Sequence, residues 1–86
     1  MSNKQPIRTL RRGPIHVAIW AHEASESRYY KVSLQKRYFD EEAQEFRGTQ
    51  SLGRDELPMV RSVLEEAYDA IFELQAADRA EQSEQS

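Results

Sequence analysis

Residues 57–74 carry a single apolar stripe, which limits the fold of this chain more than any other feature. Its members recur three and four positions apart, at Leu57, Val60, Leu64, Ala67, Ile71 and Leu74. This spacing predicts one amphipathic α-helix of about five turns. Asp55 is the expected N-cap, with Gly53 and Arg54 as alternatives. Pro58 fits the first turn, where a missing backbone donor costs nothing.

The residues before this helix alternate between apolar and polar side chains, which is typical of β-strands. Within 15–20 the odd-numbered residues are strongly apolar, and within 29–35 the even-numbered residues are. We therefore expect the odd-numbered residues of the second strand to face water or a ligand. The segment 21–27 is predicted to be a turn. The pattern leaves open which face Trp20 and Lys36 occupy.

The remaining segments complete an α+β domain. Residues 40–45 are too acidic for a strand interior and predict a hairpin connection. A third strand is expected over 46–52, and 7–10 can add a short strand at the start. The predicted organisation is a flexible N-terminus over 1–6, one domain over 7–77 and a disordered acidic tail over 78–86.

The small size of the domain points to an oligomer. A domain of roughly 70 residues buries only about 60% of its unfolded surface, and this chain has no cysteine with which to form disulfides. The predicted helix also carries more apolar surface than a small sheet needs, because further apolar residues widen its stripe. We therefore expect a homodimer formed through helix residues Met59, Val63, Ala67, Ala70, Ile71 and Leu74.

Several classes of function find no support in the sequence. His16 and His22 would lie about 20 Å apart on a straight strand, too far to share a metal ion. No nucleophile, histidine and carboxylate form a catalytic motif, and the three glycines do not form a phosphate loop. We expect neither an enzyme nor a bound cofactor. Without an apolar run suited to a signal peptide or a membrane span, the expected location is cytoplasmic.

Charge is distributed unevenly along the chain. Residues 1–54 carry a net charge of +4 and residues 55–86 carry −7, which together give the overall −3. A basic sheet can therefore bind a polyanion although the whole chain is acidic. Basic strand residues can follow a phosphate backbone while aromatic residues stack on bases, but the same residues also serve as a solvated sheet face. The candidate residues from this pattern are Arg12, Trp20, Lys31, Lys36, Arg37, Tyr38, Phe39, Arg47 and Thr49, and Tyr29 offers a further flat surface for a base.

The order of these segments resembles a known family. The run from Lys31 to Asp40, the hairpin, Ser51-Leu52, and then Leu57-Pro58 with the long helix resemble the positive cofactor four family of single-stranded DNA-binding transcriptional coactivators. The resemblance covers 13–72 and is closest to the short bacterial and phage members. It implies a curved antiparallel sheet of about four strands, followed by one C-terminal helix through which two copies dimerise.

The resemblance also implies a function. Members bind single-stranded DNA with little sequence preference, and the positions carried over are Lys31, Gln35, Lys36, Arg37, Tyr38 or Phe39, and Arg47. Gln35 stands where the family often has a cation, and the hairpin 40–45 is unusually short and acidic. The expected role is an accessory in transcription, replication or repair, nucleoid-associated if bacterial, that binds single-stranded DNA or RNA. The alternative is a protein-interaction module whose acidic helix and tail bind a basic protein.

Overall fold

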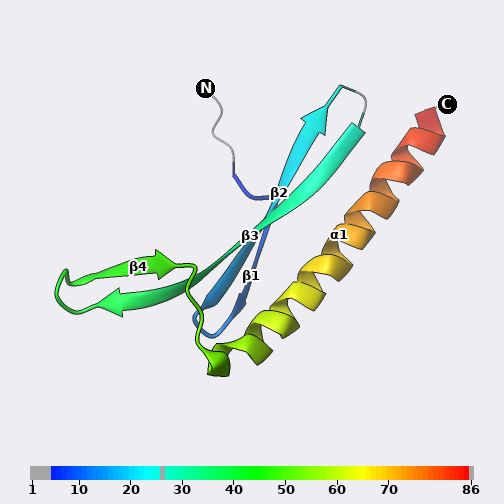
Figure 1. Ribbon diagram of the computed structural model, residues 1–86. Helices are drawn as coiled ribbons and strands as arrows, with labels where there is room; N and C mark the ends of the chain where they lie inside the picture. Colours follow the sequence, from blue (N-terminus) through cyan, green and yellow to red (C-terminus); the bar gives the residue numbers. More distant parts are fainter. Residues whose placement is uncertain (1–4, 26, 86) are drawn as a thin grey trace.

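The protein is a four-stranded antiparallel sheet followed by one C-terminal helix, as the computed structural model of the chain shows (Figure 1). The structure describes residues 5–25 and 27–85, with side chains up to residue 81. The strands lie in the order β1-β2-β3-β4. The predicted α+β class and the order of elements are therefore confirmed. The elements are β1 (Arg8–Arg12), β2 (Ile15–Ala24), β3 (Ser27–Asp40), β4 (Glu45–Thr49), a 3₁₀ turn η1 (Arg54–Glu56) and α1 (Leu57–Gln85).

The hairpin between β2 and β3 is longer than predicted. The sequence pattern predicts a turn over 21–27, whereas the two strands stay paired out to Ala24 and Ser27. His22 and Tyr29 pair across the strands near this end, and their rings stack with centroids 5.3 Å apart. Cross-strand aromatic contacts of this kind stabilise paired strands, which extends the ladder to the tip.

Strand β3 continues past β2 and forms an arm with β4 (Figure 1). The predicted acidic hairpin is confirmed. The Asp40 carboxylate accepts hydrogen bonds from the backbone N–H groups of Glu42 at 3.0 Å and Ala43 at 3.3 Å, and Gln44 has a positive φ of 54°. Asparagine and aspartate side chains favour turns because they form such hydrogen bonds with nearby backbone groups. The strand predicted over 46–52 is shorter and ends at Thr49.

The core lies between α1 and one face of the sheet. Ile15, Val17 and Ile19 of β2 are fully buried there, as the alternating pattern predicts. They pack against Val63, Ala67 and Ala70 of α1, which are also buried. The two alanines are small, which allows the helix axis to approach the sheet closely. The helix packs mainly on β1 and β2.

This packing corrects the predicted dimer interface. Val63, Ala67 and Ala70 belong to the core of their own chain, and Met59 and Ile71 pack against that core. Leu74 is half-buried. The large apolar helix residues that remain exposed lie on a neighbouring stripe with spacings of seven, four and four. We call this stripe the α1 patch: Leu57, Leu64, Tyr68 and Phe72, with 42–69% exposure.

The end of α1 also differs from prediction. Instead of a disordered tail over 78–86, the structure continues the helix to Gln85, and only Ser86 of that segment lies outside the described residues. Asp78 is half-buried and accepts hydrogen bonds from the Tyr30 hydroxyl at 2.5 Å and from Arg28 at 3.3 Å. Burial and the bond to Asp78 raise the pKa of Tyr30. These contacts tie the last turns of the helix to β3.

At the opposite end of the chain, residues 1–4 of the predicted flexible N-terminus lie outside the described residues.

The start of the helix is fixed by one glutamate. The 3₁₀ turn η1 precedes α1 and has Gly53, one of the two alternatives to Asp55, as its N-cap. The Glu56 carboxylate accepts a hydrogen bond from the Gly53 N–H at 2.7 Å and forms an ion pair with Lys36 of β3. The bond from Lys36, followed by that from Gly53, lowers the pKa of Glu56. Lys36 therefore faces the helix side of the sheet, with no bulge in β3.

We expect Glu56→Gln to reduce stability more at neutral pH than in acid. A carboxyl group whose pKa is lowered by folding stabilises the fold above its unfolded pKa, about 4.3 for Glu, and loses this effect as the pH falls through the folded value. The urea midpoints of the two proteins should therefore differ at pH 7, and the difference should shrink as the pH falls below the unfolded pKa of the carboxyl group. Glu65→Gln, an exposed carboxylate on α1, is the control. A gap that persists unchanged at pH 3 would contradict the assignment.

Candidate nucleic-acid interface

The sheet has two faces, and α1 covers only one of them (Figure 1). Side chains alternate between the faces along each strand, and the cross-strand register keeps neighbours on the same face. Residues on the face opposite the core are therefore fixed by their pairing with one another. We call this the outer face, and its strand positions are Thr9, Arg11, His16, Ala18, Trp20, His22, Ala24, Ser27, Tyr29, Lys31, Ser33, Gln35, Arg37, Phe39, Phe46 and Gly48.

Along the described strands, the carboxylates are confined to the helix side of the sheet. The outer-face strand positions carry three permanent cations, Arg11, Lys31 and Arg37. Along the described strands none of these positions is a carboxylate, since Glu23, Asp40 and Glu45 all fall on the helix side by register. Positive charges gathered on one face without carboxylates attract a polyanion, because the phosphates of the polyanion neutralise them.

Cations on the helix side are mostly neutralised. Arg12 pairs with Glu66 at 2.6 Å, and Lys36 pairs with Glu56. Arg47 contacts Asp40 at 3.1 Å and the neighbouring glutamate of β4 at 3.5 Å. By contrast, none of the three outer-face cations forms an ion pair with any described residue (5–25 and 27–81). The outer face therefore presents positive charge that the fold itself does not use.

Aromatic rings lie at both ends of the outer face. Near the β2–β3 tip, Tyr29 stacks on His22, and the Lys31 ammonium lies 5.9 Å from the Tyr29 ring centroid. On the β3–β4 arm, Phe39 and Phe46 pack edge to face with centroids 5.2 Å apart and remain 44% and 66% exposed. Rings this exposed, on the same face as free cations, can stack on bases.

Trp20 lies between the tip and the middle of the outer face. Its indole N–H donates a hydrogen bond to the Ser33 hydroxyl at 3.0 Å across the β2–β3 ladder. Trp20 is half-buried, and its position on the outer face settles the facing that the sequence pattern leaves open. The indole is held by its hydrogen bond, which gives the face a flat, fixed surface between the two aromatic ends.

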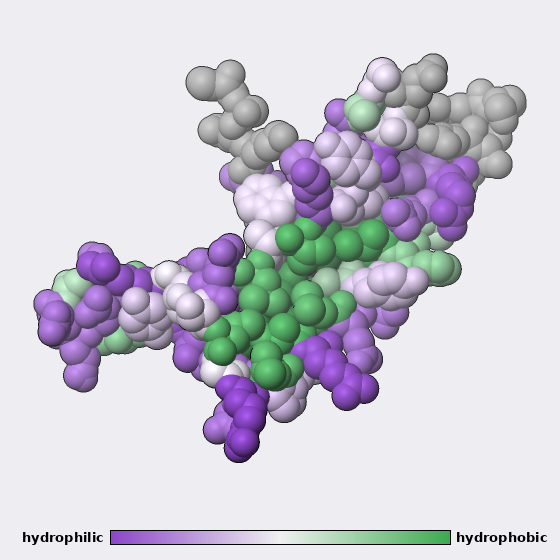
Figure 2. Space-filling view, viewed as in Figure 1, coloured by the Kyte–Doolittle hydropathy of each residue, from purple (hydrophilic) through white to green (hydrophobic). Residues whose placement is uncertain are grey.

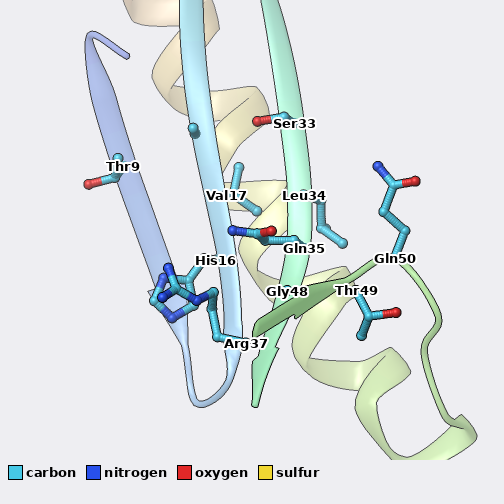
Figure 3. Close-up of a pocket in the computed structure, with 11 residues that line it drawn as sticks. Thr9, His16, Val17, Ser33, Leu34, Gln35, Arg37, Gly48, Thr49 and Gln50 are labelled. Carbon is cyan, nitrogen blue, oxygen red and sulfur yellow. The ribbon is translucent and has the colours of Figure 1, made fainter. Parts of the chain in front are cut away.

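The middle of the outer face is hollowed (Figure 3). An open hollow of about 470 Å³ is lined by residues of all four strands, among them His16, Gln35, Arg37 and Gly48. Gln35 extends over Gly48, where a Cβ would lie only 2.1 Å from the Gln35 amide oxygen. Because Gly48 has no side chain, the Gln35 side chain can occupy the space above it. Figure 3 shows the His16 ring and the Arg37 side chain next to one another at the β1–β2 end of the hollow.

The structure brings together only some of the predicted site residues. Trp20, Lys31, Gln35, Arg37 and Phe39 share the outer face. The others fall on the helix side by register. These are Arg12, Lys36, Tyr38, Arg47 and Thr49, the last at the rim of the hollow. Arg47, for example, pairs with Tyr38 and not with Arg37.

Tyr29, predicted from the odd-numbered pattern of its strand as a surface for base stacking, also lies on the outer face. Arg11, His16 and Phe46 lie there too, although they were not among the predicted site residues. Alternation with the buried Ile15 and Val17 is the sequence signal for His16. Arg11 and Phe46 depend on the registers of β1 and β4, which no local pattern specifies.

Other kinds of site are not apparent in the part of the chain that the structure describes. Within it, no group of three or more histidine or carboxylate side chains is placed to hold a metal ion. Among the described helices, none is both long and apolar enough to cross a membrane. No protein-family model, curated protein or solved structure matches the chain.

Proposed function

We propose that the protein binds single-stranded nucleic acid on its outer face, largely without regard to sequence. The observation that carries this proposal is the set of unpaired cations on a face free of carboxylates along its described strands, with exposed rings at both ends. The cations follow the sugar-phosphate backbone, and the rings stack on bases, each stack worth about 1–3 kcal/mol. The protein acts by binding and carries out no catalytic step.

The rings favour a single strand over a duplex. Phe39, Phe46 and Tyr29 expose flat surfaces that only unpaired bases can reach, because the bases of a duplex already stack on one another. Every base has such a surface, so stacking gives little sequence preference. The side chains reach both DNA and RNA in this way, and single-stranded DNA is the ligand we favour.

The resemblance to the positive cofactor four family supports the same function. The fold that the resemblance implies, a four-stranded antiparallel sheet with one C-terminal helix, is the fold observed here. A shared fold does not by itself carry function, so the outer face remains the main argument. On this basis we place the protein in the cytoplasm, associated with the nucleoid if bacterial, as an accessory in transcription, replication or repair.

We further propose that two copies associate through the α1 patch. Figure 2 shows a continuous hydrophobic area along the junction of sheet and helix, and Val32 of β3 is 40% exposed on the helix side of the sheet. The α1 patch adds Leu64, Tyr68 and Phe72 to the exposed apolar surface. Exposed apolar patches of this kind mark interfaces, and a second copy supplies the burial that so small a core lacks.

The direct test is a titration of the protein into fluorescently labelled oligonucleotides. We expect the anisotropy of single-stranded DNA to rise at lower protein concentration than that of duplex DNA of equal length. Affinity should fall steeply with salt, because each phosphate contact releases counterions and adds about −0.7 to the slope of log K against log salt. Absence of binding at low salt would contradict the proposal and favour the alternative, in which the acidic helix binds a basic protein.

A further inference from the structure

Three nitrogen-bearing side chains from adjacent strands meet on the outer face. Arg11 of β1 pairs directly with His16 of β2. On the other side, His16 pairs with Gln35 of β3, and Arg37 lies two residues further along the same face. Arg11, His16 and Arg37 also line a second hollow together, beside Phe46, and Figure 3 shows His16 and Arg37 side by side. We call these three residues the Arg-His-Arg cluster.

The surroundings of His16 supply positive charge only. Arg11 faces the imidazole from β1, and Arg37 faces it from β3 together with the neutral Gln35. Strand β4 contributes the uncharged Phe46 and Gly48, and α1 packs on the opposite face of the sheet. Burial, followed by the charges of Arg11 and Arg37, lowers the pKa of His16. Because pH 7 already lies above the ordinary pKa of a histidine, this lowering keeps His16 mostly neutral in the free protein at that pH.

An oxyanion reverses this balance. A phosphate group between the two arginines accepts hydrogen bonds from their guanidinium groups and cancels their charge, which removes the repulsion against a protonated imidazole. The imidazolium can then donate a further bond to the same anion. We propose that Arg11, His16 and Arg37 form one oxyanion site for a nucleic-acid phosphate, and that His16 takes up a proton when the site is filled. This inference rests on the proposed function.

The proposal makes binding depend on pH. Because the bound state holds one more proton than the free state, affinity rises as the pH falls through the range between the bound and free pKa values of His16. Each unit by which the phosphate raises the pKa of His16 makes binding about tenfold tighter at the acidic end of that range. Above the bound pKa both states are neutral at His16, and the pH dependence disappears.

The first experiment measures the pKa of both histidines by NMR. The protein is titrated alone, with inorganic sulfate against chloride at equal ionic strength, and with single-stranded oligothymidine. Sulfate is chosen because its charge is constant over this pH range. We expect sulfate and oligothymidine each to raise the pKa of His16, whereas His22, at the other end of the outer face, should respond less.

The second experiment measures affinity for oligothymidine between pH 5.5 and 8.5 at constant salt. The native protein should bind more tightly as the pH falls, with a slope approaching one proton, and His16→Gln should show a much flatter profile. His22→Gln, the matched control, should keep the native slope whatever its absolute affinity. An unchanged slope in His16→Gln would overturn the proposal.

The outcomes separate this inference from the proposed function. If oligothymidine binds but leaves the pKa of His16 unmoved, the proton-linked site is wrong and the proposed function stands. If oligothymidine does not bind while sulfate raises the pKa of His16, the oxyanion site stands for a free anion and the proposed function is wrong. If neither ligand moves the pKa of His16, the site is overturned.

Discussion

Replacing Arg11, Lys31 and Arg37 together by glutamate is expected to abolish binding to single-stranded DNA. These are the outer-face cations that no described carboxylate neutralises, and reversal places three negative charges where phosphates would lie. Losing three phosphate contacts should lower the salt slope by about 2 and reduce affinity at 50 mM salt on the order of 100-fold or more. Fluorescence anisotropy over a series of salt concentrations measures both quantities.

A matched triple variant separates local charge from net charge. Arg54, Arg61 and Arg79 are exposed and lie outside the sheet, and their replacement by glutamate changes the net charge by the same amount. This control should lose far less affinity, because it leaves the outer face intact. Equal losses in both triples would attribute binding to net charge alone, and undiminished binding by the outer-face triple would remove the site from this face. Circular dichroism checks that both variants are folded.

The fold could be predicted largely from the spacing of apolar residues, because alternation marks the strands and spacings of three and four mark the helix. The buried Ile15, Val17 and Ile19 were identified from alternation alone. The end of the helix was not, because residues 78–86 have the composition of a solvated tail. What holds that segment is a bond from Tyr30 to Asp78, whose partners lie 48 positions apart. Composition does not report such a distant contact.

The candidate site was less predictable than the fold, for a geometric reason. Which face a strand residue occupies depends on register, and a shift of one residue reverses the facing of every side chain. Arg37 was placed correctly because its strand carries a clear alternating pattern. Arg47 was not, because the β4 segment has no apolar alternation and its facing follows from pairing with Tyr38. Lys31 and Arg37 were therefore found, but Arg11 was missed, and so was the separation of paired from unpaired cations.

The helix shows a second limit of pattern reasoning. Its apolar residues cover two neighbouring stripes, and the sequence does not state which stripe meets the sheet. The structure places Val63, Ala67 and Ala70 inward and leaves Leu64 and Phe72 exposed. Two small alanines allow closer approach to the sheet than a leucine and an aromatic ring do, which is consistent with the choice. The same residues that were expected to join two subunits are therefore needed to fold one.

The double variant Leu64→Glu and Phe72→Glu is expected to convert a dimer into a monomer. Both side chains are exposed in the single chain, at 42% and 56%, so the fold of one copy should tolerate the change. In the proposed dimer the new carboxylates would be buried against apolar surface, at a cost of several kcal/mol. Light scattering should give twice the mass of one chain for the native protein and the mass of one chain for the variant.

Ala77→Glu with Ala80→Glu is the control, since both alanines are exposed, both lie away from the α1 patch around the helix, and the added charge is the same. This control should remain dimeric. A native protein that is monomeric at tens of micromolar would contradict the dimer, and a Leu64→Glu, Phe72→Glu variant that stays dimeric would move the interface away from the α1 patch. The monomeric variant also reports on binding, because its outer face is unaltered. If each copy contributes a strand-binding face to one continuous site, the variant should bind long oligonucleotides more weakly while its affinity for short ones is retained.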